Sequence, residues 1–265
     1  MKNVISSLSN PQMKNLTLLQ KKAKAREEQS LFVIEGLKMF EDAREANILV
    51  KAFVAQSLYE ELVGSDASYF IDMEYEIVKD AILKEISDTM SPQGIVGTVR
   101  KIKYSLTDII STPSAFLLLL EDIRDPGNLG TILRTAEGAG ITGVIFNDTC
   151  VDIYNPKVIR ATMGSIYRVP FYQTGDFFDV ISDMKKLGIR IYAAHLQGEP
   201  YDTEGNFLSK CAFLIGNEAN GLSERASSMA DSLVKIPMKG KVESLNAAVA
   251  ASILMYEVAR QRRKY

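Results

Sequence analysis

The sequence predicts an α/β protein in two parts, a smaller α/β domain followed by a larger domain built on a parallel sheet. Short apolar runs typical of buried strands alternate with segments of helical periodicity. A polar stretch at 101–114 separates two such series. The chain of 265 residues is long enough for two modest domains. We therefore place the domains at 1–100 and 115–265, with 101–114 as the linker.

The composition is that of an ordinary globular chain, with 46% hydrophobic residues, 24% charged residues and a net charge of −2. Any contact with nucleic acid must therefore come from local basic patches. The longest fully apolar run, 115–120, is too short to cross a membrane, and the amino terminus lacks a secretory signal, so we expect a cytoplasmic protein. Cys150, Cys211 and His195 cannot supply a closed four-ligand zinc site, and we predict no metal.

The first domain opens with a helix signal. Asn10-Pro11 is typical of an N-cap followed by proline at the first helical position, and it predicts one helix over 11–28. Strands are expected at 31–34, at 50–54 and after the turn at 91–94. Residues 1–30 contain six Lys or Arg and two Glu, so this segment forms a local cationic surface.

The second domain shows a longer series of strands, at 116–120, 143–146, 190–194, 212–215 and 232–236. Helical or loop segments separate them, which predicts a doubly wound parallel sheet. One of these helices is expected at 176–187 after an aspartate cap, and an alanine-rich helix at 247–260 ends the domain.

Three junctions after these strands carry unusual chemistry. Ligands of parallel sheets bind at the carboxyl ends of the strands, so these junctions are the candidate site. The first contains Asn128, a plausible helix cap, and Arg134, which could reach a phosphate; a capped surface helix without function is the alternative. The second contains Glu218 between glycines, although such loops also occur as simple turns. In the third, Ser244 or Asn246 could simply cap the last helix.

Several common signatures are missing. The chain has no G-x-G-x-x-G and no G-x-x-x-x-G-K-[ST], so neither a typical NAD enzyme nor a P-loop NTPase fits. Gly164-Ser165 lacks the flanks of a nucleophile elbow, and a serine hydrolase would need His195 with partners that the sequence does not identify.

Taken together, the three junctions resemble the SpoU/TrmH branch of the SPOUT-class RNA ribose methyltransferases. The resemblance covers 113–265, including the segment 158–165, and it departs from the family at Ala219-Asn220, where relatives often have a glycine beside the glutamate. The first domain is similar to the ribosomal-protein-like RNA-binding domain that precedes many such units. The motifs that carry the resemblance are Pro126–Gly130 with Arg134, Gly216–Glu218 with Gly221, Ile236–Met238 with Ser244–Asn246 and, in the first domain, Asn10-Pro11, Lys14 and Glu35-Gly36.

The resemblance implies a deep trefoil knot from about 209 onward, an exception to the rule that folds avoid knots. It implies S-adenosylmethionine held in the knot, a homodimer that shares its site, and methyl transfer to a ribose 2′-hydroxyl of rRNA, with large-subunit rRNA expected and tRNA possible. The implied cofactor-binding residues are Leu196, Gly216, Ile236, Met238 and Leu245.

The resemblance also assigns catalytic roles. We expect Arg134 to bind the target phosphate, and either Arg134 or that phosphate to receive the proton, because an arginine with a pKa above about 12 is an awkward base. Asn128, Glu218, Ser244 and Asn246 would fix the ribose and the arginine. RNA is expected to bind the cationic surface through Lys14, Lys21, Lys22 and Arg26.

Two alternatives remain open at this stage. The first is a non-catalytic RNA-binding protein that retains the knotted fold, which an assay of methyl transfer to rRNA or tRNA would distinguish. The second is an unrelated nucleotide-dependent α/β enzyme, which binding measurements with NAD and S-adenosylmethionine would separate.

Overall fold

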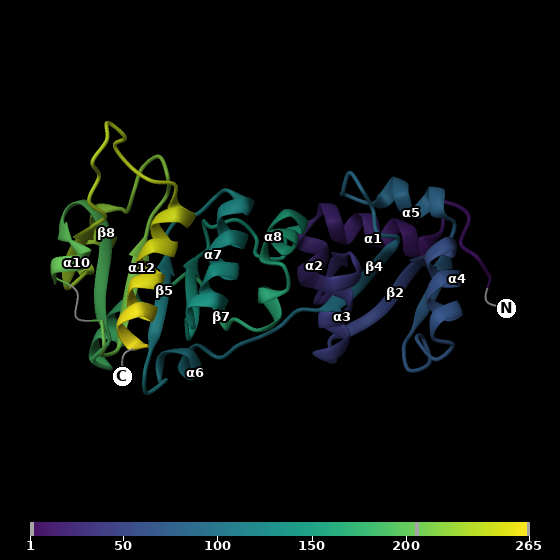
Figure 1. Ribbon diagram of the computed structural model, residues 1–265, viewed down its shortest axis with the longest axis horizontal. Coiled ribbons are helices and arrows are strands. Elements are labelled where there is room, and N and C mark those ends of the chain that lie inside the picture. The colour runs from purple at the N-terminus through teal and green to yellow at the C-terminus, as the bar shows by residue number, and fades with distance from the viewer. Residues whose placement is uncertain (1–2, 205–206, 264–265) are drawn as a thin grey trace. The chain divides into compact units, whose positions relative to one another are not determined.

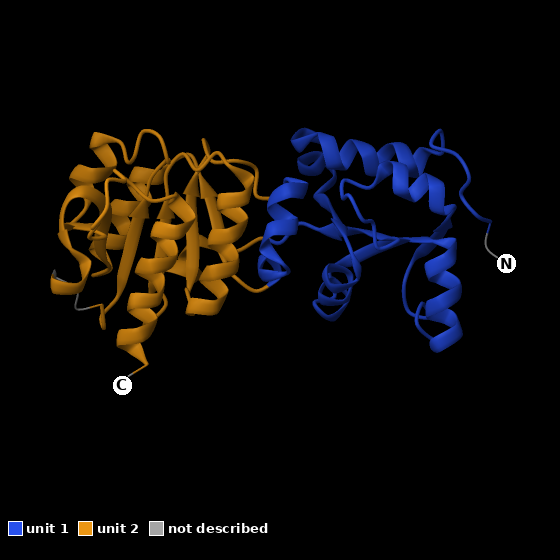
Figure 2. Ribbon diagram, turned by 45° about the horizontal axis from the view of Figure 1, so that its top comes forward, with its two compact units in different colours: residues 1–102, 154–167 blue, residues 103–153, 168–265 orange. Residues whose placement is uncertain are grey.

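The structure is a computed structural model that describes residues 3–204 and 207–263. The chain divides into two compact units, which Figure 2 shows in different colours. Unit 1 is made of residues 1–102 and 154–167, and unit 2 of residues 103–153 and 168–265. As boundaries of separately folding domains, 1–100 and 115–265 stay a prediction. No helix within the described ranges is both long and apolar enough to cross a membrane.

Unit 1 is a four-stranded sheet with helices on both faces (Figure 1). Its strand order is β1-β4-β2-β3, and only the pair β2 and β3 is parallel. Side chains of α1 and α5 pack on one face of the sheet in a common apolar core, and α4 packs on the other face. The elements are α1 Pro11–Lys21, α2 Ala23–Gln29, β1 Leu31–Glu35, α3 Leu37–Glu45, β2 Leu49–Ala55, α4 Gln56–Ser65, β3 Tyr75–Val78, α5 Asp80–Ile86, β4 Ile95–Arg100, α8 Pro156–Thr162 and a 3₁₀ turn at Ser165–Tyr167.

The continuous helix predicted over 11–28 is wrong, because the chain breaks into α1 and α2 at Lys22, which has an extended backbone. Arg26 explains why the break is stable. Its guanidinium is buried and donates to the carbonyl oxygens of Leu19 at 2.6 Å and Gln20 at 3.1 Å, which α1 leaves without helical partners. The prediction that Arg26 belongs to the RNA-binding surface is therefore wrong as well.

Unit 2 is a six-stranded sheet in the order β10-β8-β9-β5-β6-β7, and every neighbouring pair is parallel. The predicted α/β class with a parallel sheet is confirmed. Helices α6, α9 and α11 pack on one face, whereas α7 and α12 pack together on the other. The elements are α6 Leu106–Ile110, β5 Phe116–Leu120, α7 Pro126–Ala139, β6 Gly143–Asn147, β7 Phe171–Thr174, α9 Phe177–Lys186, β8 Arg190–Pro200, α10 Tyr201–Glu204, β9 Cys211–Ile215, α11 Glu224–Met229, β10 Ser232–Lys235 and α12 Ala247–Arg262.

Two strands of unit 2 differ from the prediction. The edge strand β7 was not predicted, because four residues of mixed burial carry little periodic signal. Strand β8 continues to Pro200, beyond the predicted end at 194. Its register against β10 shifts between Leu233 and Val234, and a Cβ atom at Gly198 would lie 2.5 Å from the Leu233 carbonyl carbon, so only glycine fits this close approach.

Candidate active site

The three predicted junctions follow three parallel strands of the sheet in unit 2, of which β9 and β5 are neighbours and β10 is separated from β9 by β8. In the order β10-β8-β9-β5, the strands β10, β9 and β5 end at Lys235, Ile215 and Leu120. All of them are parallel, so the loops that follow leave the same edge of the sheet. We call this edge, with the loops 121–128, 216–223 and 236–246, the carboxyl edge.

Helix α7 begins at the carboxyl edge with a cap that differs from the predicted one. The side chain of Asp125 is the N-cap and accepts a hydrogen bond from the Asn128 backbone N–H at 2.8 Å. Asn128 is therefore not the cap. Its side chain is left available for contacts with the other two loops.

A chain of hydrogen bonds joins all three junctions. The Asn246 side-chain amide donates to Asn128 Oδ1 at 2.9 Å, and the Asn128 amide donates to a carboxylate oxygen of Glu218. Asn246 Oδ1 in turn accepts from the backbone N–H groups at the start of α12, so Asn246 both caps this helix and contacts Asn128. We call Asn128, Glu218 and Asn246 the amide cluster. Glu218 supplies the one carboxylate of this cluster.

Arg134 and Ser244 lie outside the amide cluster. Arg134 follows Asn128 by six residues on α7, which places it about 9 Å along the helix and about 120° around it. Its side chain is exposed and makes no hydrogen bond or ion pair in the part of the chain that the structure describes. Ser244 is exposed in the loop before α12. The catalytic roles of both residues stay predictions.

The loop between β10 and α12 has free backbone groups. Among residues 3–204 and 207–263, none of residues 237–245 makes a hydrogen bond. Apolar side chains are exposed nearby at Leu196 and Val242, which are 65% and 61% accessible. Such backbone donors and acceptors beside apolar surface suit a nucleoside cofactor that is read without charged side chains. The loop therefore fits the adenosine part of S-adenosylmethionine.

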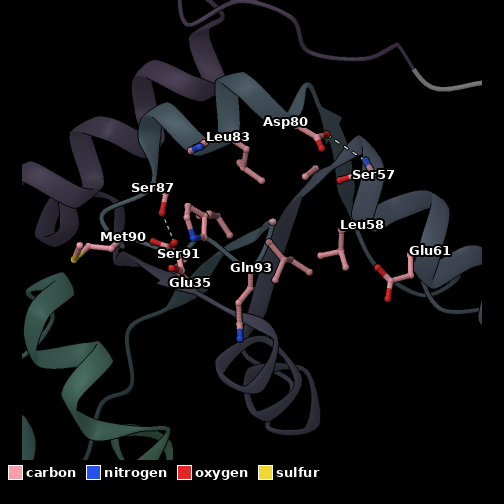
Figure 3. A pocket seen from close by; sticks show the side chains of 16 residues that line it. Glu35, Ser57, Leu58, Glu61, Asp80, Leu83, Ser87, Met90, Ser91 and Gln93 are labelled. Atoms are coloured by element: carbon pink, nitrogen blue, oxygen red, sulfur yellow. Dashed lines mark hydrogen bonds between the residues drawn. The ribbon is translucent and has the colours of Figure 1, made fainter.

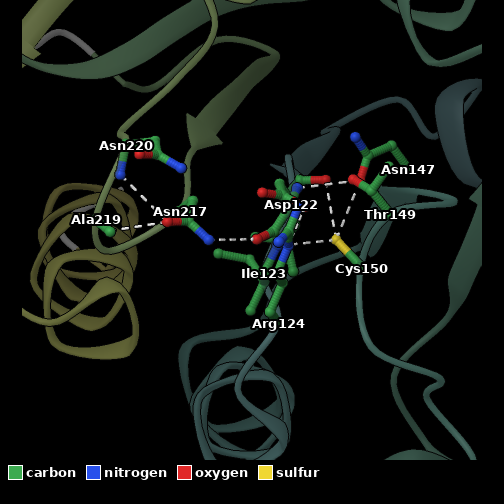
Figure 4. A network of polar contacts seen from close by, with 10 residues as sticks. Asp122, Ile123, Arg124, Asn147, Thr149, Cys150, Asn217, Ala219 and Asn220 are labelled. Atoms are coloured by element: carbon green, nitrogen blue, oxygen red, sulfur yellow. Dashed lines mark hydrogen bonds and ion pairs between the residues drawn. The ribbon is translucent and has the colours of Figure 1, made fainter.

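A second polar network joins the first loop to the segment 147–150 and to Asn217 (Figure 4). The sequence patterns did not reveal it. The Asp122 N–H donates to Asn147 Oδ1 at 3.1 Å, and the Ile123 N–H donates to the Cys150 sulfur at 3.2 Å. Asn217 donates its amide to the Asp122 carbonyl at 2.9 Å. Asp122 adopts a left-handed backbone with φ 58°. Burial raises the pKa of Cys150 to about 11, so its thiol acts as a packing and hydrogen-bonding group.

Comparison with known families supplies the deciding observation, because the SpoU rRNA Methylase family matches residues 115–256. The chain belongs to this family. The MRM3-like substrate binding domain matches residues 10–97. With the family established, the chain is an S-adenosylmethionine-dependent RNA methyltransferase, and this confirms the predicted activity and cofactor over both alternatives.

Individual relatives of this SpoU-family chain are methyltransferases as well. The 23S rRNA (guanosine(2553)-2′-O)-methyltransferase RlmP of Bacillus subtilis is 31% identical over 96% of this chain and 98% of its own length. An AdoMet-bound rRNA methyltransferase from Sinorhizobium meliloti is 30% identical with a TM-score of 0.83 over 97% of both chains. The SpoU methyltransferase AviRb of Streptomyces viridochromogenes, in complex with AdoMet, is 26% identical with a TM-score of 0.85 over 96% of this chain and 98% of its own.

Unit 1 of the SpoU-family chain offers two surfaces of opposite charge. Lys14, Lys21 and Lys22 are exposed on α1 and at its end. A cavity of about 450 Å³ elsewhere in the unit is lined by the carboxylates of Glu35 and Asp80, among others (Figure 3). In the described part of the chain, no three His, Cys, Asp or Glu side chains are grouped as metal ligands would be. The carboxylates of Glu35, Glu61 and Asp80 outnumber Lys84 in the lining of this cavity, so it suits phosphate less well than the lysine surface does.

Proposed function

We propose that this chain transfers the methyl group of S-adenosylmethionine to a ribose 2′-hydroxyl of large-subunit rRNA. The observation that carries this proposal is the amide cluster, in which Asn128, Glu218 and Asn246 from three separate motifs meet at the carboxyl edge. The Bacillus subtilis relative, a 23S rRNA 2′-O-methyltransferase that is 31% identical over nearly its whole length, supports the ribose as the methylated group and 23S rRNA as the substrate class.

The mechanism assigns binding and positioning to this chain's residues. S-adenosylmethionine supplies a methyl group activated by a sulfonium. The free backbone groups of 237–245, with Gly216, Ile236 and Leu196, hold the nucleoside, and Met238 and Leu245 complete the apolar contacts. The amide cluster would orient the ribose so that its 2′-oxygen could attack the methyl group. The new oxygen–carbon bond would replace the carbon–sulfur bond, and the cofactor would leave as a neutral thioether.

The proton of the 2′-hydroxyl has two candidate acceptors. Arg134 binds the phosphate beside the target ribose, since its guanidinium forms bidentate hydrogen bonds to phosphate oxygens. The phosphate so held, or Arg134 itself in its neutral form, takes the proton. We favour the phosphate, because a guanidinium is in general a poor proton acceptor. Ser244 adds a hydroxyl that can contact the ribose.

We infer that the complete site needs two copies of the chain. In the described ranges the Arg134 side chain makes no hydrogen bond or ion pair with the amide cluster of its own chain, which leaves it available to the cluster of a second copy. Val249 and Tyr256 leave apolar surface on the exposed side of α12 that a second copy could cover. A trefoil knot from about 209 onward belongs to the same proposal, as does a cytoplasmic location.

Unit 1 is proposed to hold the RNA. Lys14, Lys21 and Lys22 form an exposed cationic surface on a segment that matches a substrate-binding domain. Phosphate contacts of this kind position an RNA without reading its sequence. Replacing the three lysines with glutamine should raise the KM for rRNA and leave the affinity for S-adenosylmethionine unchanged.

The proposed target is tested by mapping ribose methylation in cells with and without this chain. One 2′-O-methyl group of large-subunit rRNA should disappear with the chain and return when it is restored. A lost methyl group in tRNA would correct the substrate. If every ribose methyl group persists, the proposed reaction is wrong.

A further inference from the structure

We propose that Glu121 is a positioning residue for cofactor binding, because its buried carboxylate holds the Gly216–Ser223 loop against the end of β5. Nothing in the sequence motifs singles out this residue. The inference rests on the proposed function, since that loop carries Gly216 and Glu218 of the candidate site.

The contact between Glu121 and Ser223 uses the whole carboxylate. Glu121 is only 7% exposed and directly follows β5. One of its oxygens accepts from the Ser223 backbone N–H at 2.8 Å, and the other accepts from the Ser223 hydroxyl, also at 2.8 Å. Within the described ranges no cation pairs with it. A buried carboxylate without a counter-charge is unfavourable for packing alone, so its contribution lies in where it fixes Ser223.

Two consecutive residues hold both ends of this loop. Glu121 holds Ser223 at the far end, and the Asp122 carbonyl accepts the Asn217 amide at 2.9 Å at the near end. The left-handed backbone of Asp122, with φ 58°, lets the chain turn so that both contacts form from adjacent positions. Glu121 and Asp122, directly after β5, therefore fix both ends of the loop.

The interior of the loop has little freedom to absorb a change at its ends. A Cβ atom at Gly216 would lie 2.4 Å from the Gly221 carbonyl carbon, so the two ends of the turn are in close backbone contact. Asn217 and Gly221 also exchange backbone hydrogen bonds at 2.8 and 3.1 Å. Release of Ser223 would consequently move Gly216 and Glu218 together, so that Glu218 would leave Asn128 and Gly216 would leave the position in which it is proposed to bind the cofactor.

The substitution Glu121→Gln keeps the size of the side chain but removes one acceptor. Its Oε1 can still accept the Ser223 N–H, but its amide NH2 faces the Ser223 hydroxyl, which must then accept instead of donate. Two hydrogen bonds to a carboxylate are thus replaced by weaker ones to a neutral amide. We expect the Kd and the KM for S-adenosylmethionine to rise about ten-fold. The kcat at saturating cofactor should change less than the KM, because bound cofactor selects the loop position in which Glu218 meets Asn128.

The experiment compares the full chain with Glu121→Gln, Ser223→Ala and the double variant, by calorimetric titration with S-adenosylmethionine and by methyl-transfer kinetics. If the contact acts as one unit, the double variant should bind no more weakly than the weaker single variant. Asp231→Asn is the matched control, because Asp231 Oδ2 also accepts a backbone N–H, that of Ile191 at 2.8 Å, but precedes β10 at the opposite edge of the sheet. It should lose thermal stability and keep its cofactor affinity.

Two results would overturn the inference. The first is that Glu121→Gln binds S-adenosylmethionine as tightly as the unaltered chain does. The second is that the affinity of all variants, including Asp231→Asn, follows their thermal stability. If the unaltered chain itself neither binds the cofactor nor transfers methyl groups, the proposed function fails instead.

Discussion

The two edges of the parallel sheet in unit 2 differ in how far their backbone groups are paired, although a carboxylate binds the backbone at each edge, Glu121 at one and Asp231 at the other. At the carboxyl edge, neutral amides of Asn128, Asn217 and Asn246 join loops whose backbone groups remain partly free. At the opposite edge, which we call the amino edge, charged side chains bind the backbone directly, as Arg262 and Asp231 do. We infer that the contacts at the amino edge stabilise the unit, whereas the carboxyl edge leaves backbone donors and acceptors available to ligands.

The largest effect is expected at the carboxyl edge. Arg134→Ala should lower kcat/KM for methyl transfer by about 100- to 1,000-fold, the usual loss when a donor that acts on the transition state is removed. The melting temperature should hardly change, because Arg134 is exposed and unpaired in the described part of its chain. Arg134→Lys keeps the positive charge but removes the planar pair of donors of the guanidinium. If the turnover of this variant is unchanged, the assignment of Arg134 to the target phosphate is wrong.

The next effect is expected at the amino edge. Arg262 donates to the carbonyl oxygens of Phe207 at 3.0 Å, Ser114 at 2.9 Å and Ser209 at 2.7 Å, and it lies over the Phe116 ring. Arg262→Ala should therefore lower the free energy of unfolding by about 3 kcal/mol in a denaturant titration. The KM values of the folded enzyme should stay the same. A loss of activity without a loss of stability would break the distinction between the edges.

A smaller effect separates two roles of Asn246. Asn246→Ala removes the N-cap of α12 and should cost about 1 kcal/mol of stability. Asn246→Asp retains a capping oxygen but cannot donate to Asn128 Oδ1, and it adds a negative charge close to Glu218. This variant should unfold like the unaltered chain in denaturant and yet lose most of its methyl transfer. If Asn246→Asp stays active, the amide cluster is only a structural cap.

The smallest effect concerns pH. Burial alone would raise the pKa of Asp231, but hydrogen bonds from the Ile191 N–H and Lys185 outweigh it and lower the pKa from its ordinary value of 3.8. A lowered folded-state pKa stabilises the fold above the unfolded value, and this stabilisation is lost as the pH falls through the folded pKa. Unfolding of Asp231→Asn should accordingly depend less on pH below 3.8 than unfolding of the unaltered chain. Parallel pH profiles for the two proteins would contradict this.

Local patterns predicted much of the fold but fewer of its contacts. The run of five apolar residues at 116–120 coincides with β5, and the alternation of strands and helices predicted the parallel sheet. Patterns failed where nearby groups compete for one role. Asp125 caps α7 in place of Asn128, and the buried Arg26 stabilises a break at Lys22 that helical periodicity cannot reveal.

The residues of the candidate site also divide into those that local patterns predicted and those that they did not. Asn128, Glu218 and Asn246 were predicted, with Arg134 and Ser244, as residues of one catalytic site, and hydrogen bonds join the first three in the structure. Glu121, Asn147 and Cys150 were missed because each acts on a residue far away in the sequence or on a loop that only the folded sheet brings near. Polar residues directly after β5 and β6 were the available signal, and parallel strand ends are where such residues deserve weight.

The most direct test of the account is the position of the transferred methyl group. The purified chain is incubated with methyl-labelled S-adenosylmethionine and unmodified 23S rRNA, and the RNA is then digested to nucleosides. The account predicts that the label appears in one 2′-O-methyl nucleoside and is nearly absent with Arg134→Ala. Label on a base, or equal 2′-O label with Arg134→Ala, would contradict it.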